Sequence, residues 1–491
     1  MVIRHTQHTA SDAIDAAEAS TSSRHSTPSS PTPSIKQDDT LPTITQTLIT
    51  RLLSSANAQT GLLPSLGYWQ TANAYTAIAL HDIWSTRPSS RPSSRPSSRP
   101  SNHPHNRPPD HPPNHPSSHP PNPHPNIPLL HHLLSLTLHH IPHCINDFND
   151  DTLWYALLLL HLHTATGDKG YLSTCRAIYA HVRRFVLPRG ARDAKGRDVE
   201  GAVLWKSVPE GGGDWPSCRE VNSVTTGLWG EFCGLLAGVE LGRGEKGERQ
   251  GAEIEGGDAG WAFPGPGELV EQAMTSIGFI LATLFRSDEL VVLDTLKLDT
   301  GEVVEWTFTY TTAQTVAGCI AIHSAVLDLP DSSVGDAMMQ HKQRKRADSL
   351  LVLAVWMVAS AMRRREWVED GVLAEYSAYG PDTHDAEENN DAVGFKSVLV
   401  RTIGKMYDYL RLLQKEGVEV EGLHRKEMGM ECKKMKRFVE STFESVRSFR
   451  EDDEGRYGPW WAGPRGKSTM HSNMAVMDLM AVMSLMIQDD Q

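Results

Sequence analysis

Two adjacent carboxylates stand at the start of a long apolar stretch. They belong to the segment Asn149-Asp150-Asp151-Thr152-Leu153-Trp154, and four consecutive leucines follow two residues after it. Consecutive side chains in the middle of a helix do not face each other, but at the entry turn the backbone is freer and both carboxylates can point into one cavity. Carboxyl groups about 5–5.5 Å apart, the spacing of retaining glycosidases, are then reachable, whereas the inverting gap of about 6.5–9.5 Å is harder to reach.

The two carboxylates are expected to differ in protonation. The helix N-terminus favours keeping one of them ionised. Its negative charge raises the pKa of the neighbour, which then keeps a proton to donate. One motif therefore offers a nucleophile and a general acid. The alternative is structural, because Asn and Asp are common at helix starts, and the local sequence alone favours that simple capping role.

Tryptophan is the second feature with chemical potential. Several tryptophans lie beside polar residues at the ends of predicted elements: Trp69, Trp154, Trp306, Trp460 and Trp461. Flat rings stack on the C–H faces of sugars, although any single tryptophan more commonly packs in a core. No metalloprotease, hydrolase-elbow or phosphate-loop motif is present. The GRGEKG at Gly242–Gly247 follows a helical pattern instead of a strand, so it does not indicate a dinucleotide site.

The elements that must position these residues are mostly helical. Apolar residues recur at helical spacing in about twelve stretches, which cover roughly residues 43–56, 68–84, 128–141, 151–165, 169–186, 220–241, 267–286, 312–328, 346–364, 395–415, 428–449 and 470–487. Residues 289–310 alternate instead around Asp299-Thr300-Gly301 and predict a β-hairpin. Twelve helices suggest six helical pairs, and this all-α pattern fits a toroid of helix hairpins as well as an irregular bundle.

Three segments dilute the expected core. Residues 1–40 are rich in Ser, Thr, Pro and His without periodicity and are predicted to be disordered. Residues 86–126 carry a proline every few positions, which favours a low-complexity insertion in a surface loop. Residues 242–260 form a Gly- and Glu-rich loop. The length of 491 residues, which alone would suggest about three domains, is therefore expected to encode a single domain over 41–491.

Composition excludes several classes of protein. The net charge of −13 argues against a dedicated nucleic-acid binder. The best apolar run, Leu350–Met362, is shorter than the ~20 residues of a membrane span. The first residues lack an apolar signal region, which predicts a cytoplasmic protein, or a secreted one if the true start is missing. The six cysteines are far apart and never CxxC, so no disulfide scaffold, metal site or cofactor is expected.

Several short fragments occur in an order and spacing that point to a known family. They are Tyr68-Trp69-Gln70-Thr71-Ala72-Asn73, Asp150–Leu157, Thr166-Gly167-Asp168 with Tyr171-Leu172, Asn222, Trp306–Gly318 with Asp294 ahead of it, Phe395-Lys396 with Arg401, and Trp461-Ala462-Gly463-Pro464. In this arrangement the chain resembles glycoside hydrolase family 76, the α-1,6-mannanase-like family of six-hairpin glycosidases. The resemblance covers roughly residues 43–487 apart from the two insertions.

The resemblance implies an (α/α)6 toroid and retaining cleavage or transfer at α-1,6-linked mannose, with α-mannan or a mannose-containing oligosaccharide as partner. Carried over by motif, Asp150 is the nucleophile and Asp151 the general acid/base. The expected substrate-binding residues are Trp154, Asn222, Asp294, Trp306, Tyr310, Phe395, Lys396 and Trp461. No metal or cofactor is implied.

The sequence also departs from the family pattern. Thr311, Thr312 and Ala313 replace an Asn, a Gln and a Gly, and Thr226 stands where a second Asn is usual. The lost amides remove potential hydrogen-bond partners for sugar hydroxyls. The Cβ of Ala313 also leaves less room for a sugar than a glycine would. Three functions therefore remain open: hydrolysis of α-1,6-mannan, transglycosylation on cell-wall mannan or the mannose core of glycolipid anchors, and non-catalytic mannan binding.

Overall fold

The computed structural model describes residues 40–86, 124–207, 219–245, 262–330, 337–450 and 455–489. The predicted disordered segment, apart from Thr40, lies outside the described residues. So do most of the Pro-rich insertion, at 87–123, and most of the Gly-rich loop, at 246–261.

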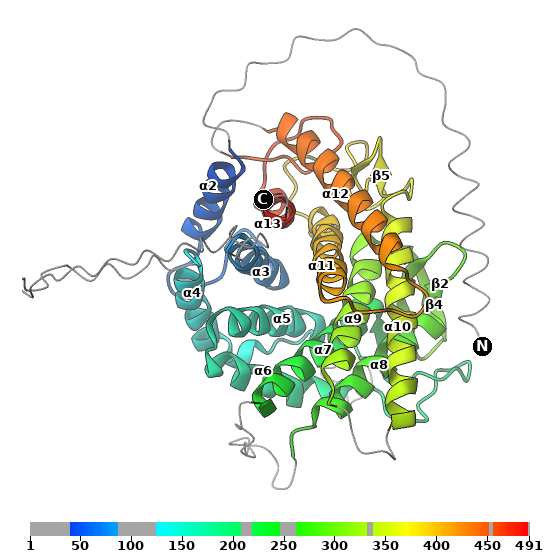
Figure 1. The fold of residues 1–491 in the computed structure, drawn as a ribbon. Helices are drawn as coiled ribbons and strands as arrows, with labels where there is room; N and C mark the ends of the chain where they lie inside the picture. The colour runs from blue at the N-terminus through cyan, green and yellow to red at the C-terminus, as the bar shows by residue number, and fades with distance from the viewer. Residues whose placement is uncertain are drawn as a thin grey trace, which may run out of the picture.

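The described residues contain twelve α-helices, which confirms the predicted all-α class (Figure 1). They are α2 (Leu41–Ser54), α3 (Tyr68–Ser85), α4 (Ile127–His140), α5 (Asn149–Thr166), α6 (Lys169–Val182), α7 (Ser223–Glu245), α8 (Pro266–Thr283), α9 (Thr309–Asp328), α10 (Ala337–Ala361), α11 (Phe395–Glu416), α12 (Arg425–Ser448) and α13 (Met470–Gln488). Each matches one predicted stretch, with boundaries that differ mostly by a few residues.

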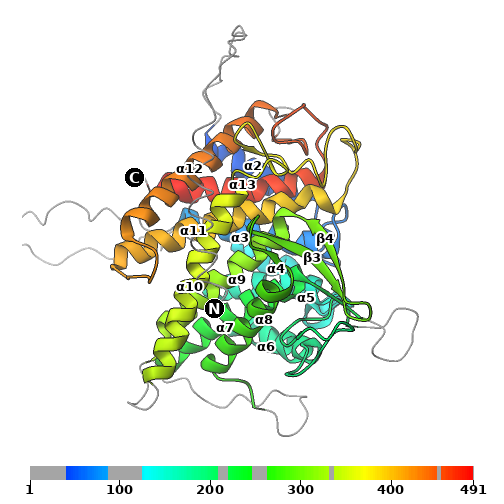
Figure 2. The same ribbon diagram turned by 90° about the vertical axis from the view of Figure 1, so that its right-hand side faces the viewer.

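Six of these helices close a ring. Helices α3, α5, α7, α9, α11 and α13 contact one another in that order, and α13 returns to α3. The other six lie outside: α2 on α13, α4 on α3, α6 on α5, α8 on α7, α10 on α9 and α12 on α11. Each inner helix is therefore paired with an outer one, which is the (α/α)6 toroid (Figures 1 and 2).

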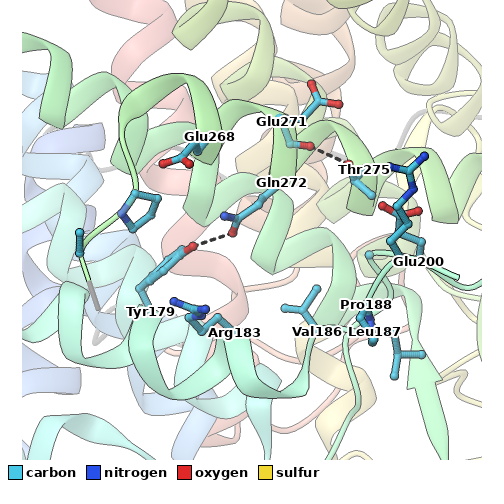
Figure 3. A pocket seen from close by; sticks show the side chains of 14 residues that line it. Tyr179, Arg183, Val186, Leu187, Pro188, Glu200, Glu268, Glu271, Gln272 and Thr275 are labelled. Atoms are coloured by element: carbon cyan, nitrogen blue, oxygen red, sulfur yellow. Dashed lines mark hydrogen bonds between the residues drawn. The ribbon is translucent and has the colours of Figure 1, made fainter. Parts of the chain in front are cut away.

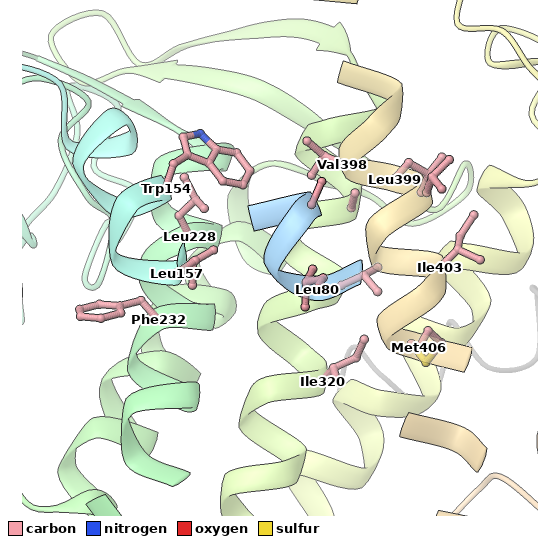
Figure 4. Packing of buried hydrophobic residues seen from close by; sticks show 14 of the residues in the cluster. Leu80, Trp154, Leu157, Leu228, Phe232, Ile320, Val398, Leu399, Ile403 and Met406 are labelled. Carbon is pink, nitrogen blue, oxygen red and sulfur yellow. The ribbon is translucent and has the colours of Figure 1, made fainter. Parts of the chain in front are cut away.

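The sequence pattern separates the two layers. The inner helix α5 is buried without interruption from Thr152 to Leu160, and a helix that is apolar all round belongs in a core. The outer helix α12 buries Met428, Cys432, Met435 and Val439, a stripe at spacings of three and four, and exposes charged residues between them. Figure 4 shows side chains from the inner helices gathered in one cluster.

The α13 helix is the one described helix that is long and apolar enough to cross a membrane. Its most apolar stretch of 18 residues is 83% buried inside the fold. It belongs to the inner ring, between α3 and α11. Its apolar composition is therefore accounted for by its place in the core.

A small sheet lies at one end of the ring. The predicted hairpin is present as β3 (Val291–Lys297) and β4 (Glu302–Thr307), and Figure 2 shows it beside the ends of the helices. Two short strands also pair with β3, namely β1 (Glu220–Asn222) and β2 (Phe285–Arg286). Because residues 220–222 pair with β3 as strand β1, helix α7 begins at Ser223 instead of the predicted residue 220. It also continues to Glu245, four residues into the predicted Gly-rich loop.

The ends of the Pro-rich insertion are joined at the toroid surface. Asp82, near the end of α3, accepts hydrogen bonds from the backbone N–H groups of Asn126 (2.7 Å) and Ile127 (3.2 Å) at the start of α4. Its other carboxylate oxygen accepts from the Asn126 side chain at 2.7 Å. This buried carboxylate satisfies the first N–H groups of α4. Helices α3 and α4 are therefore joined although residues 87–123 separate them in the sequence.

Candidate active site

The ring presents the starts of its inner helices to the same end of the molecule as the sheet. Trp69 lies in the first turn of α3, Asp150 and Asp151 in that of α5, Tyr310 in that of α9, and Phe395 opens α11. Because each outer helix returns the chain to the same end, residues far apart in sequence meet there. This arrangement explains why the sequence motifs cluster at helix starts.

The first turn of α5 is anchored by a neighbouring extended segment. The backbone N–H of Asn149 donates to the carbonyl of Trp205, and the Asn149 side chain donates to the carbonyl of Leu204, each at 2.8 Å. Asn149 is itself fully buried. Asn149 therefore fixes the helix start, and the next two residues are presented at a defined position.

Asp150 and Asp151 open into a cavity of about 900 Å³. Eight of the ten predicted site residues line it: Asp150, Asp151, Trp154, Asn222, Asp294, Trp306, Tyr310 and Phe395. A second cavity, of about 550 Å³, lies between α6, α8 and the chain around Leu187, where Tyr179 donates to Gln272 at 2.7 Å (Figure 3). It contains none of the ten.

Asp150 is held by two donors. The indole Nε1–H of Trp205 donates to its Oδ2 at 3.0 Å, and the backbone N–H of Asp151 donates to its Oδ1 at 2.9 Å. Burial raises the pKa of Asp150 to about 6, while both hydrogen bonds oppose that rise. The nearby Asp294 adds a smaller upward contribution to the pKa.

Asp151 has a different environment. Its Oδ2 accepts one hydrogen bond, at 2.9 Å, from the side-chain amide of Asn146. Burial, together with smaller contributions from the charges of Asp150 and Asp391, raises the pKa of Asp151 to about 8. The two carboxyl groups therefore titrate as a pair that holds one proton near neutral pH, and Asp151 holds it more tightly. Such a pair supplies one anion and one acid side by side.

Aromatic rings extend from the carboxylates across the cavity. The ring centroid of Trp69 lies 6.0 Å from that of Trp154 and 6.4 Å from that of Phe395. Phe308 continues the row, 5.1 Å from Phe395 and 6.0 Å from Trp306. Trp306 ends it on β4 with 63% of its surface exposed. An exposed indole at the end of an aromatic row offers a flat surface for a ring-shaped ligand.

Polar groups also line the cavity. Asp294 on β3 accepts from Thr295 Oγ1 at 3.0 Å and from the Tyr310 hydroxyl at 3.4 Å. Asn222 accepts the backbone N–H of Thr225 at 2.9 Å and so caps α7. Burial raises the pKa of Asp294 as well.

Two predicted site residues, Lys396 and Trp461, lie behind the cavity and do not line it; each has 1% of its surface exposed. The Lys396 ammonium donates to the carbonyl of Val393 at 3.1 Å and lies 5.2 Å from the Trp461 ring. Burial raises the pKa of Glu375 to about 7 and the charge of Lys396 opposes that rise, while Glu375 accepts the backbone N–H of Thr309 at 2.7 Å. Both residues therefore support the start of α9, which carries Tyr310.

The departures from the family pattern also lie away from the cavity. Thr311 Oγ1 donates to the carbonyl of Val292 at 3.0 Å, and Thr312 Oγ1 accepts the Val292 N–H at 3.1 Å. Thr226 Oγ1 accepts the N–H of Val203 at 3.1 Å. These buried threonines join α9 and α7 to the segments that surround the cavity, and none of them lines it.

Sequence reasoning missed several residues of the site. Trp205, Phe308 and Asp391 line the cavity, and Asn146 contacts Asp151. Asp391 lies in a short 3-10 turn, η4 (Asp391–Gly394), and accepts a hydrogen bond from Gln70. Of these residues, only Asn146 could have been suspected from the sequence, because it lies four residues before Asp150. Among the described residues no group of His, Cys, Asp and Glu is arranged to hold a metal ion.

Comparison with known proteins shows the fold. No family model matches the chain, and no curated protein matches it. Among solved structures, the chain is similar to an α-1,6-mannanase of glycoside hydrolase family 76 from Salegentibacter sp. HEL1_6. That structure is an inactive variant, with two consecutive aspartates replaced by asparagine, in complex with α-1,6-mannotriose. The identity is 16%, the match covers 91% of this chain and 99% of the other, and the TM-score is 0.58.

Two further structures agree. A family 76 mannosidase from Bacteroides thetaiotaomicron matches with 10% identity over 92% of this chain and 100% of its own, with a TM-score of 0.53. Dfg5 from Chaetomium thermophilum in complex with glucosamine matches with 12% identity over 92% of each chain, with a TM-score of 0.54. The chain therefore has a glycoside hydrolase family 76-like fold along nearly all of its length.

Proposed function

We propose that this protein is a retaining glycosidase that cleaves α-1,6-linked mannose chains. The observation that carries the proposal is the Asp150–Asp151 pair, two adjacent buried carboxyl groups that line one cavity together with several aromatic rings. A related fold that binds α-1,6-mannotriose supports the choice of substrate. That structure was made inactive by replacing two consecutive aspartates, which parallels the pair in this chain.

The reaction takes two steps. Ionised Asp150 attacks the anomeric carbon of a mannose unit while the bond to the departing O6 breaks, and Asp151 gives its proton to that oxygen. The product is a mannosyl ester on Asp150. Asp151, now a carboxylate, then takes a proton from a water molecule that attacks the same carbon, and the ester bond breaks to release Asp150. Two inversions at one carbon give overall retention.

The site also accounts for how the substrate is held. Trp69, Phe395 and Phe308 offer ring faces to successive sugar units, and Trp306 extends that surface outward. Asp294 and Asn222 place polar groups near the reacting carboxylates, where sugar hydroxyls require partners.

The test is activity on linear α-1,6-mannan, with α-1,2- and α-1,3-linked mannosides as matched substrates. Wild-type protein is expected to release mannooligosaccharides from the α-1,6 polymer only. Asp150→Asn and Asp151→Asn keep the size of each side chain and are expected to lose nearly all activity while retaining the wild-type melting temperature. A wild type as inactive as both variants on every mannoside would exclude the proposal.

The charge of the cavity favours transglycosylation on a glycan with an amino sugar as a second candidate function. Seven carboxyl groups line the cavity: Asp150, Asp151, Glu220, Asp294, Glu302, Glu305 and Asp391. Its one lining cation among the described residues, Lys297, is paired with Glu302 at 3.0 Å. An ammonium group on a sugar would be attracted to such a surface, and the similar Dfg5 structure holds glucosamine.

Product analysis separates the two functions. The protein is incubated with an α-1,6-mannooligosaccharide, with and without a glucosamine-containing mannoside as acceptor. Free sugar forms if water attacks the ester, and longer glycans form if the acceptor attacks it. The third hypothesis, non-catalytic mannan binding, was motivated by Thr311–Ala313. Because these residues do not line the cavity, their identity gives no reason to expect a loss of chemistry.

A further inference from the structure

We infer that Trp205 is a positioning residue that holds the carboxyl group of Asp150 in its ionised form, ready to act as nucleophile. The inference rests on the proposed function, since it assigns a role within that reaction. It concerns a residue that comes from a connecting segment, outside every motif of the sequence.

The chemistry of the donor carries the first step. An indole N–H can donate a hydrogen bond but cannot accept one. Its bond to Asp150 Oδ2, at 3.0 Å, therefore stabilises a carboxylate more than a carboxylic acid. A hydroxyl or a side-chain amide at the same place could reverse its role and accept a hydrogen bond from the protonated acid. Trp205 has no such alternative.

The indole is fixed before any ligand arrives. The backbone of Trp205 accepts the N–H of Asn149 at 2.8 Å and donates to the carbonyl of Glu220 at 2.9 Å, so it is tied to both α5 and β1. Its ring lies 5.2 Å from that of Phe148, and the Lys206 ammonium lies 5.1 Å from its centre. Such double anchoring holds the donor in one orientation without further ordering during the reaction.

Most other charged groups around Asp150 are carboxyl groups, and the charge of Asp294 favours its protonation, whereas the start of α5 and the Lys206 ammonium beside the indole favour the anion. Asp151 follows on α5, Glu220 lines the cavity from β1, Asp294 lies on β3, and Asp391 approaches from η4. The Tyr310 hydroxyl, on α9, donates to Asp294 and not to Asp150. Against these carboxyl groups, the Trp205 indole and the backbone N–H of Asp151 are the donors that hold the anion. Without the indole, the proton shared by the pair would move toward Asp150.

The kinetic test is the pH dependence of Trp205→Phe, which keeps an aromatic ring against Phe148 and removes the donor. The acidic limb of kcat/KM is expected to move up by about one to two pH units. At about one unit below the wild-type limb, kcat/KM of the variant should be about tenfold or more below that of the wild type, and the deficit should shrink as the pH rises. A purely structural role would lower activity equally at all pH values, and that outcome would overturn the inference.

A second measurement does not depend on activity. In protein labelled with 15N-tryptophan, the Trp205 indole signal, assigned by its loss in Trp205→Phe, should shift with pH as Asp150 ionises. In Asp150→Asn that titration should disappear. The buried indoles of Trp229 and Trp367, which have no hydrogen-bond partner among the described residues, serve as internal controls and should not shift.

The outcomes distinguish the inference from the function on which it rests. A Trp205 signal that titrates in an enzyme without mannosidase activity would support the contact and refute the proposed function. An active enzyme whose Trp205 signal is insensitive to Asp150 would refute the inference alone.

Discussion

Replacing Arg401 with methionine should destabilise the toroid strongly. Its guanidinium donates to both carboxylate oxygens of Asp478, at 2.7 and 2.8 Å, and to the side chain of Asn73 at 2.6 Å. The side chains of Arg401 and Asp478 are 2% and 1% exposed. These contacts join the inner helices α11, α13 and α3 beneath the cavity. Arg401→Met keeps a long side chain and removes every donor.

The expected loss of stability follows from the Asp478 carboxylate that remains buried in the variant. Loss of one partner leaves the Asp478 carboxylate buried without its counter-charge, which typically costs about 3–5 kcal/mol. At roughly 2 °C per kcal/mol for a large domain, the melting temperature should fall by about 6–10 °C. Replacing both partners, as in Arg401→Met with Asp478→Leu, removes the buried charge and should cost less than the single change.

The pH dependence gives an independent check. Burial already raises the pKa of Asp478 against the opposing pull of Arg401, so removal of Arg401 raises it further. The native state then binds a proton that the unfolded state releases, and its stability falls as the pH rises above the unfolded pKa. The deficit of Arg401→Met relative to wild type should therefore be smaller near pH 5 than near pH 8.

The assay is thermal unfolding of the wild type, both single variants and the double variant at these two pH values. Chemical denaturation at one temperature provides the free energies for a double-mutant cycle. A single variant that loses less than about 1 kcal/mol, or a double variant less stable than Arg401→Met, would refute the assignment of this pair as a structural support.

Three further predictions concern the site and its support. Asp391→Asn removes a negative charge that raises the pKa of Asp151, so the alkaline limb of kcat/KM should move to lower pH. Because Asp391 is 64% exposed, the shift should be under about one unit, and an unchanged limb would refute this influence. Trp306→Ala should raise KM about five- to thirty-fold without lowering the melting temperature, since the ring is exposed; an unchanged KM on long substrates would exclude a binding role. Gly234→Ala should destabilise α7, because an added Cβ would lie 2.9 Å from the backbone of α9. The control Gly238→Ala, whose added Cβ would have nothing within 4 Å, should be neutral or stabilising by up to about 1 kcal/mol. Equal melting temperatures of the two variants would contradict this difference.

Helix periodicity was sufficient to predict the architecture because each layer has its own pattern. The uninterrupted apolar stretch of α5 and the apolar stripe of α12 both stand out in the sequence. Short strands do not. Residues 220–222 were assigned to a helix, but they pair with β3, a partner some 70 residues away. The strands β5 (Val368–Glu369) and β6 (Val372–Leu373), which pair with each other, were not predicted because two residues are too few to show an alternating pattern.

The candidate site was predictable where chemistry and helix starts coincide. Asp150 and Asp151 were identified as a pair from their types and spacing, and the structure brings Trp154 and Phe395 to the same cavity. Lys396 shows the limit of the family resemblance: it was carried over by motif as a substrate-binding residue, but it is buried and interacts with Glu375, which lies outside every motif. Trp205 was missed because a connecting segment positions it through contacts with α5 and β1.

The most direct test of the central claim is a time course of α-1,6-mannotetraose cleavage followed by 1H NMR of the newly formed reducing end. A retaining mechanism with Asp150 as nucleophile predicts that the α-anomer appears first and that the β-anomer accumulates only by later mutarotation. It also predicts that Asp150→Asn forms neither. Initial formation of the β-anomer, or equal cleavage by Asp150→Asn, would contradict the assignment of Asp150 as the nucleophile of a retaining mannosidase.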